Sequence, residues 1–251
     1  MILKTLINLI PFSGIRRRLR AKNKAANNPV GYSFGGASPL DFSSSPLCLV
    51  VAPHPDDELI GCGGLICKFP KLFDVLCLAS AGRNAHDMEA EEMAKIRTRD
   101  FHLIMSKAGV RRSVIFEYAG GDLCRGFYEK NIEEYCREAK LGDYGYIFLP
   151  HAKDAHEDHR AILGIVKKMA EIQGVRRLNL VFYEVWSPME KPNSWVDVGD
   201  TIHRKCKLIS MYSVGKGYAE PAEALARYRG AMLTGFSRRY AEAYRMETIA
   251  V

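Results

Sequence analysis

The sequence predicts an α/β domain with a mainly parallel sheet, preceded by a separate basic arm. Two observations predict the fold class. From Leu47 onward, short apolar and β-branched runs alternate with patterns of helical periodicity. Clusters of histidine and carboxylate residues then follow two of those runs, and parallel sheets bind ligands at the carboxyl ends of their strands. With 251 residues, 47% of them hydrophobic, the chain is long enough to bury a sizeable core.

The first 46 residues are expected to form a basic amphipathic arm (residues 1–24) and a linker (residues 27–46). Apolar residues recur near helical spacing until Pro11, and basic residues follow. Seven bases precede the first acid, Asp41, so the rest of the chain balances at 29 bases against 29 acids. Two interpretations remain open: an anchor on an anionic lipid surface, or a helix packed on protein with a solvated basic linker.

The same arm is too short to span a bilayer, which needs roughly 20 apolar residues. Its bases follow the apolar part instead of preceding it, so a signal peptide is not expected. The seven cysteines are odd in number, scattered through apolar stretches and without a CxxC pair, which favours a reduced, cytoplasmic protein.

The compact domain is expected to span residues 47–251. In chain order, strands are predicted at 47–53, 75–80, 113–118, 144–150 and 178–186, and helices at 89–108, 129–140 and 156–172. This alternation is typical of a Rossmann-like three-layer domain. The stretch "YAEAY" (residues 240–244) is expected to pack as part of a C-terminal helix.

The first cluster, "APHPDDE", follows the first strand of this domain, and the second, "LPHAKDAHEDHRAIL", follows the fourth. In the second cluster Asp154 can cap a helix, which would place His156 and His159 on one helical face. Imidazoles and a carboxylate, with one position left to water, are the ligands of a catalytic zinc. His54, Asp57 and His159 would supply that set.

Asp56 is then a carboxylate beside the metal that is not needed as a ligand, suited to taking a proton from water. His156 would stabilise or protonate what the attack produces. The constellation predicts hydrolysis of a carbonyl or phosphoryl bond. Taken singly, either cluster could be a helix cap or a solvated helix start. "GCGG" (residues 61–64) is weak evidence for phosphate binding, because close helix–sheet packing explains it.

"PHPDDELIGCGG" together with "DAHEDHRA" resembles the signature pair of the zinc-dependent de-N-acetylases called PIG-L-like or LmbE-like proteins. The resemblance extends over roughly residues 47–244. It implies zinc, or another divalent metal, as the cofactor. It assigns the metal ligands to His54, Asp57 and His159, the general base to Asp56, oxyanion stabilisation or amine protonation to His156, and an orienting role to Asp158.

Substrate-binding residues are expected from the same resemblance. Arg99 resembles an arginine that binds the distal part of the substrate, with an exposed helix residue as the alternative. Asp122 in "GGDL" matches a family acid, with a turn aspartate as the alternative. Glu184, at the end of a strand beside Trp186, would line the sugar pocket or finish the core.

The expected function is removal of the acetyl group from an N-acetylglucosamine-type sugar within a glycoconjugate. The arm favours a lipid-linked glycan precursor met at the cytoplasmic face of the membrane, with peripheral contact through residues 1–24. The alternatives are a deacetylase of a small soluble glucosaminide and a non-catalytic sugar-binding protein of the same fold. A nucleic-acid partner is not expected, because the charge beyond residue 24 is balanced. The oligomeric state is not predicted.

Overall fold

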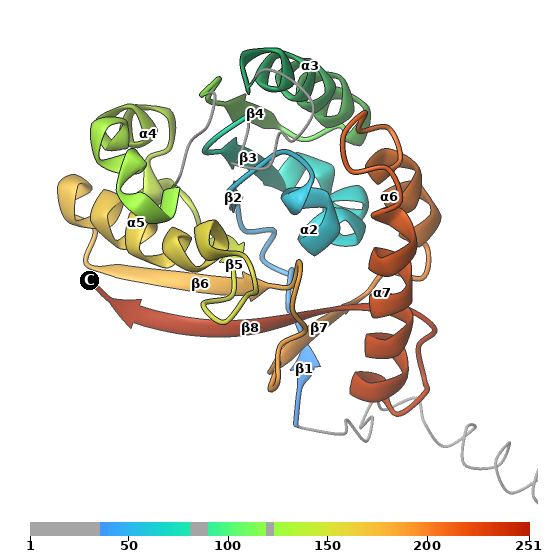
Figure 1. The fold of residues 1–251 in the computed structure, drawn as a ribbon. Helices are drawn as coiled ribbons and strands as arrows, with labels where there is room; N and C mark the ends of the chain where they lie inside the picture. The colour runs from blue at the N-terminus through green and yellow to red at the C-terminus, as the bar shows by residue number, and fades with distance from the viewer. Residues whose placement is uncertain (1–35, 81–89, 119–122) are drawn as a thin grey trace, which may run out of the picture. The chain divides into compact units, whose positions relative to one another are not determined.

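The computed structural model of the chain describes residues 36–80, 90–118 and 123–251 (Figure 1). Its strands are β1 (Ser38–Pro39), β2 (Cys48–Ala52), β3 (Phe73–Cys77), β4 (Arg112–Ile115), β5 (Tyr146–Pro150), β6 (Arg177–Tyr183), β7 (Ser194–Asp197) and β8 (Ala241–Ala250). Its α-helices are α2 (Asp57–Lys68), α3 (Ala90–Ala108), α4 (Ile132–Glu138), α5 (Glu157–Gln173), α6 (Ile202–Ile209) and α7 (Ala219–Thr234). Short 3₁₀ helices lie at η2 (Pro70–Leu72), η3 (Leu123–Arg125), η4 (Phe127–Lys130) and η5 (Leu141–Asp143).

The strands of the described residues form one sheet in the order β1-β7-β8-β6-β5-β2-β3-β4. The strands β6, β5, β2, β3 and β4 run parallel to one another. Strand β8 is antiparallel to both of its neighbours, β6 and β7. The prediction of an α/β domain with a mainly parallel sheet is therefore confirmed, and the antiparallel strand lies outside the parallel block.

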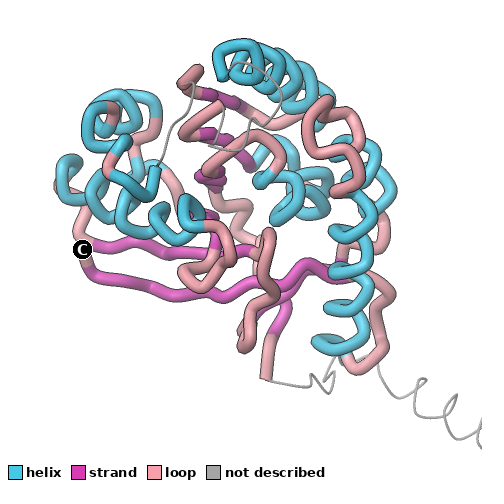
Figure 2. The backbone as a smooth tube through the Cα atoms, in the orientation of Figure 1, coloured by secondary structure: helices cyan, strands magenta, loops and turns pink. Residues whose placement is uncertain are grey.

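Helices cover both faces of the sheet, as Figures 1 and 2 show. One hydrophobic core joins α2, α3, α6 and α7 to one face, with Val50 of β2 pointing into it. A second core joins α4 and α5 to the opposite face, with Leu49 and Val51 of the same strand. Alternate residues of a strand point to opposite faces, so a strand buried on both sides is apolar throughout. This explains why the β2 sequence is a continuous apolar run.

The C-terminal segment differs from its prediction. The sequence suggests a helix that includes residues 240–244, but Ala241–Ala250 is strand β8. Its first four residues are buried and its later residues are exposed or half-buried. A ten-residue strand with one face open to solvent alternates polar and apolar residues, which the alanines and glutamates of this segment obscure.

Part of the expected linker also packs on the domain. Strand β1 (Ser38–Pro39) pairs with β7, and Phe42 stacks on Phe69 with ring centroids 5.4 Å apart. From residue 36 onward, the described residues belong to one compact unit. The amphipathic arm predicted at residues 1–24 lies outside the described residues. Among the described helices, none combines the length and the apolar character that a membrane span requires.

Two glycines of α2 allow the helix to lie close to its neighbours. A Cβ atom added at Gly61 would stand 2.2 Å from the ring of Tyr183, and one at Gly64 would stand 2.5 Å from Val198. Real Cβ contacts are essentially never that short, so a side chain at either position would force α2 or the facing side chain to shift. Packing therefore accounts for the "GCGG" stretch, and the position of α2 fixes the residues at its N-terminus.

Candidate active site

The two histidine-containing motifs meet because β2 and β5 are neighbours in the sheet. The two strands run parallel, with Val50 paired to Phe148. The loops after Ala52 and Pro150 therefore leave the same edge of the sheet before α2 and α5 begin. This is the carboxyl edge, where parallel sheets bind their ligands.

Three histidines from these loops form a compact cluster. Ring nitrogens of His54, His156 and His159 lie within 4.8 Å of one another. Asp57 joins them: its Oδ2 lies 3.2 Å from Nε2 of His159 and 3.5 Å from Nδ1 of His54. The fold thus brings together the three residues predicted as metal ligands, with His156 directly beside them. Imidazole and carboxylate groups at this spacing suit a divalent cation.

His159 is the most enclosed member of the cluster, with none of its surface exposed. Its Nδ1 lies 3.1 Å from Asp154 Oδ1 and its Nε2 faces Asp57, yet within the described part of the chain neither nitrogen makes a well-aligned hydrogen bond. Burial lowers the pKa of His159, but the carboxylates of Asp57 and Asp154 outweigh it and raise the pKa to about 10. A buried nitrogen with no aligned partner, set among carboxylates, fits a metal ligand.

Asp154 has a different place from the one predicted. The sequence suggests that it caps the following helix, but the N-cap of α5 is His156. Asp154 is 1% exposed, and its Oδ2 accepts hydrogen bonds from the backbone N–H groups of Trp186 and Ser187. Its Oδ1 accepts the N–H of His156 and faces His159. A carboxylate anchored in this way orients a ligating imidazole.

The contact between His156 and Asp158 runs through the backbone N–H of Asp158, whereas the prediction gives its side chain an orienting role. Nδ1 of His156 accepts the N–H of Asp158 at 3.2 Å, so in the neutral ring the proton is assigned to Nε2. Burial, with the charges of His54 and His159, lowers the pKa of His156. Asp158 Oδ2 is 3.2 Å from Nε2 of His54, and its Oδ1 accepts the N–H of Cys124. The side chain of Asp158 is therefore joined to His54, whereas the resemblance implies that it orients His156.

Asp56 precedes Asp57 in the chain and is not one of the three histidines whose nitrogens lie at ligand spacing. The residue is 3% exposed, and its Oδ2 lies 3.7 Å from a guanidinium nitrogen of Arg97. Burial and the charge of Asp57 raise the pKa of Asp56 well above its usual range, although Arg97 opposes the shift. A buried carboxylate with a raised pKa is suited to accepting a proton near neutral pH.

The arginine that lies beside Asp56 is Arg97, whereas the sequence singles out Arg99 for substrate binding. The side chain of Arg99 is 70% exposed and pairs with the adjacent Asp100. Arg97, two residues earlier, is only 16% exposed and faces Asp56. Two residues correspond to about 200° around a helix, so only one of these side chains can point toward the site. Asp122, the second predicted substrate-binding residue, lies outside the described residues.

Glu184 is buried and has its own partners. It is 4% exposed, forms an ion pair with Arg229 and accepts the N–H of Met189. This side chain therefore finishes the core and does not offer a free carboxylate to a sugar. Trp186, two residues later, is 40% exposed and packs edge-on against Tyr218 with ring centroids 4.8 Å apart. This aromatic pair is joined to the site through the bond from the Trp186 N–H to Asp154.

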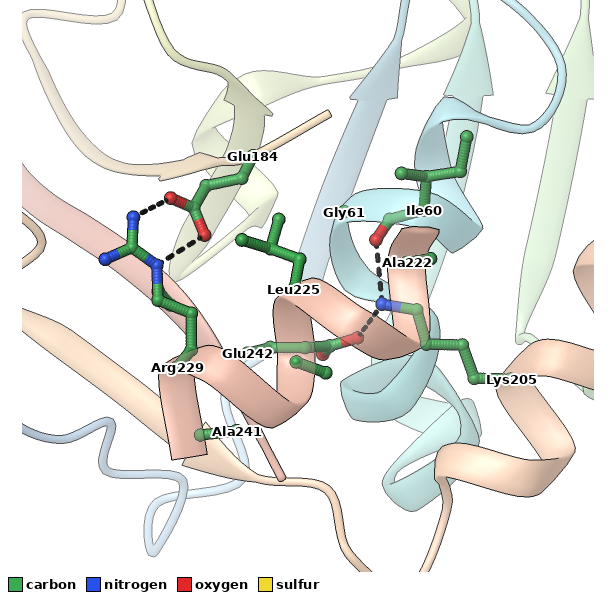
Figure 3. A pocket seen from close by; sticks show the side chains of 11 residues that line it. Ile60, Gly61, Glu184, Lys205, Ala222, Leu225, Arg229, Ala241 and Glu242 are labelled. Carbon is green, nitrogen blue, oxygen red and sulfur yellow. Dashed lines mark hydrogen bonds and ion pairs between the residues drawn. The ribbon is translucent and has the colours of Figure 1, made fainter. Parts of the chain in front are cut away.

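A small cavity is lined by residues of α2, α6, α7 and β8 and by two buried ion pairs, Glu184–Arg229 and Lys205–Glu242 (Figure 3). Its volume is about 20 Å³, which holds about one water molecule and excludes a sugar. Lys205 donates to the carbonyl of Ile60, in the first turn of α2, at 2.7 Å. The ion pairs around this cavity therefore hold α2 in place, and the cavity is not a substrate pocket.

The fold and the cluster define a class of protein: a parallel α/β domain with a buried histidine–carboxylate site suited to a divalent cation. Residues 49–170 match the family model "PIG-L: GlcNAc-PI de-N-acetylase". This match supports the expected resemblance to PIG-L-type proteins, and the matched segment runs from β2 into α5, so it contains both motifs of the site.

Solved structures with the same fold include N,N'-diacetylchitobiose deacetylase from Pyrococcus horikoshii, at 18% identity over 96% of this chain and 94% of that one, with a TM-score of 0.64. The A40926 pseudoaglycone deacetylase is 18% identical over 80% and 96% of the two chains, with a TM-score of 0.54. The 4-carboxy-2-hydroxymuconate hydratase from Pseudomonas putida KT2440 is 15% identical over 85% and 96%, with a TM-score of 0.60. These likenesses confirm the fold, and because they include a hydratase, the fold alone does not select the reaction.

Proposed function

We propose that this protein is a metal-dependent hydrolase that removes the acetyl group from an N-acetylated amino sugar. The observation that carries the proposal is Asp56, a buried carboxylate beside the histidine cluster that is not required as a ligand. A protein that only bound a sugar would have no use for such a group. The match of residues 49–170 to a family model named for a de-N-acetylase supports amide hydrolysis over other reactions.

We assign the metal to His54, Asp57 and His159, with zinc as the cation. When bound, the cation would supply Lewis-acid polarisation of the amide carbonyl and lower the pKa of a water molecule. Two further carboxylates would hold the imidazoles in place, Asp158 at His54 and Asp154 at His159. A set made of the three histidines is the alternative, because their nitrogens also lie at ligand spacing.

Asp56 and His156 would divide the proton transfers between them. Asp56 takes a proton from the attacking water while the oxygen of that water bonds to the amide carbon. His156 carries a proton on Nε2, because Nδ1 already accepts the N–H of Asp158. That Nε2–H can stabilise the tetrahedral oxyanion or pass its proton to the departing nitrogen. Breaking the C–N bond then leaves acetate and the free amino sugar.

The substrate class rests on the surroundings of the site and on the family. Trp186 and Tyr218 present partly exposed aromatic rings, and such rings pack well against the apolar faces of sugars. Solved structures of the same fold include deacetylases named for diacetylchitobiose and for an antibiotic pseudoaglycone. We propose N-acetylglucosamine within a larger conjugate as the substrate, with a small soluble glucosaminide as the competing candidate.

The basic arm leads us to propose that the conjugate is a lipid-linked glycan precursor at the cytoplasmic face of the membrane. Residues 1–24 would hold the protein on anionic lipid through apolar side chains and arginines. Full-length protein should bind vesicles that contain anionic lipid, and a variant lacking residues 1–24 should not. Equal binding by the two proteins would contradict the membrane role of the arm.

The reaction itself is tested by acetate release from lipid-linked and soluble N-acetylglucosamine conjugates. We expect metal-loaded wild type to release acetate, and Asp56→Asn to bind metal normally and lose activity about 10²-fold to 10⁴-fold. Asp200→Asn is a matched control, because Asp200 is 63% exposed and its ion pair with Lys68 lies at the surface. Metal-loaded wild type that releases no acetate from any conjugate would contradict the proposal.

A further inference from the structure

Asp56 has a backbone conformation that residues with side chains rarely adopt. Its φ is 103° and its ψ is −31°. Within the described part of the chain, Ser45 and Phe236 are the other non-glycine residues with positive φ, at 49° and 64°. Both are exposed and lie in the usual left-handed region. Asp56 is buried and lies beyond that region, so the surrounding structure must hold it there.

Glu58 supplies a hydrogen bond that can hold this conformation. Its Oε2 accepts the backbone N–H of Asp56 at 3.1 Å, and its side chain has no exposed surface. The other oxygen, Oε1, accepts the hydroxyl of Tyr212 at 2.5 Å. Tyr212 follows α6 and is 2% exposed, so it fixes the Glu58 carboxylate from a part of the chain remote in sequence.

The segment after Tyr212 also leaves room for the Asp56 carboxylate. A Cβ atom at Gly215 would stand 2.4 Å from the ring of Tyr218 and 3.2 Å from Oδ2 of Asp56. Gly215 itself has φ 86°, which favours glycine. The Asp56 carboxylate therefore has this segment and Arg97 as neighbours, whereas the Asp57 carboxylate faces His159.

We propose that Glu58 and Tyr212 are positioning residues that hold Asp56 in its strained conformation, so that its carboxylate stays beside the metal ligands without joining them. The inference rests on the proposed role of Asp56 as the base. A base that turned toward the cation would become a ligand and lose its proton-accepting role. Misplacement by about 1 Å can lower a rate about 10²-fold, so a device that fixes this side chain acts directly on catalysis.

The catalytic consequence is tested in the full-length, metal-loaded protein. We expect Tyr212→Phe and Glu58→Leu to lower kcat about 10-fold to 100-fold, with KM and bound metal unchanged. Glu58→Gln keeps an oxygen that can accept the Asp56 N–H, so it should restore most of kcat. A Glu58→Leu protein with wild-type kcat, or a Glu58→Gln protein no better than Glu58→Leu, would overturn the positioning role.

The strain is tested by melting temperature, which needs no substrate. Asp56→Gly and Asp56→Ala both remove the carboxylate, but only glycine relieves the strain at φ 103°. We expect Asp56→Gly to melt about 2–4 °C or more above Asp56→Ala. This gap should shrink when Glu58→Leu is added to each variant, because Asp56 is then no longer held.

Equal melting of the two Asp56 variants, or a gap that Glu58→Leu leaves unchanged, would overturn the claim that Glu58 holds strain at Asp56. The melting results also separate this inference from the proposed function. If no conjugate is hydrolysed but the gap appears and depends on Glu58, the deacetylase proposal fails and the holding of Asp56 stands. If a conjugate is hydrolysed but the two Asp56 variants melt at the same temperature, the deacetylase proposal stands and the holding of Asp56 fails.

Discussion

Lys205 and Glu242 lie between a carbonyl and an amide of the same turn of α2. Lys205 Nζ donates to the carbonyl of Ile60, and Glu242 Oε1 accepts the N–H of Gly64, four residues later. The two side chains pair with each other at 2.8 Å and are 2% and 4% exposed. A buried ion pair thus links α2 to α6 and β8 one turn beyond the site residues at the start of the helix.

Lys205→Met should destabilise the protein by about 3–5 kcal/mol, because Glu242 is left as a buried carboxylate without its cation. Urea unfolding followed by circular dichroism measures the change. Lys68→Met is the matched control: Lys68 also pairs with an aspartate, Asp200, but at the surface, and its loss should cost less than about 1 kcal/mol. Similar losses for the two variants would contradict a dominant role for the buried pair.

Asp154→Ala should weaken metal binding about 10-fold to 100-fold while the three proposed ligands remain. The physical reason is that His159 loses the carboxylate 3.1 Å from its Nδ1, which orients the ring. Competition with a chelator of known affinity measures the effect. Asp200→Ala, a surface change, should leave the metal affinity unchanged. Equal affinities for wild type and Asp154→Ala would show that Asp154 stabilises the loop at Trp186 and Ser187 without affecting the metal site.

The two possible ligand sets are separated by Asp57→Ala and His156→Ala. We expect Asp57→Ala to lose both bound metal and activity. His156→Ala should keep one metal per chain and lose activity about 10²-fold to 10⁴-fold, because the Nε2–H of His156 is the proposed proton donor to the reacting groups. Metal analysis on purified proteins, followed by acetate release, decides between them. Metal lost from His156→Ala but kept by Asp57→Ala would assign the site to the three histidines.

Metal binding should release a proton and strengthen as pH rises. In the metal-free protein the pKa of His159 is raised to about 10, and a ligating imidazole must be neutral. Between about pH 7 and pH 10 the affinity should therefore rise about tenfold per pH unit. Calorimetry in buffers of different ionisation enthalpy counts the protons released. An affinity independent of pH over this range would contradict the prediction.

The same shift sets the pH dependence of the metal-free fold. The folded pKa of His159 lies above the unfolded value of about 6.5. Its contribution to the free energy of unfolding is therefore complete below pH 6.5. It is lost as pH rises toward 10. The free energy of unfolding of the metal-free protein should decline over that interval, and a His159→Gln variant should show a smaller decline.

The sequence by itself determined the parallel part of the sheet and the residues that would gather at its edge. Continuous apolar runs such as the one around Val50 can be buried on both faces only in a sheet covered on both sides. The histidines and acids follow two such runs, and parallel strands bring their carboxyl ends to one edge. The pattern of the chain alone therefore suffices to place His54, Asp57 and His159 together.

The tertiary structure decided which partner each group has. Glu58 and Tyr212 are 154 residues apart and Lys205 lies 145 residues from Ile60, so no local pattern relates them. Arg97 and Arg99 look alike in sequence, and only the packing of α3 decides which one faces Asp56. Spacing along the chain fixes local elements, whereas the orientation of a helix and the contacts of a buried side chain depend on every element packed against them.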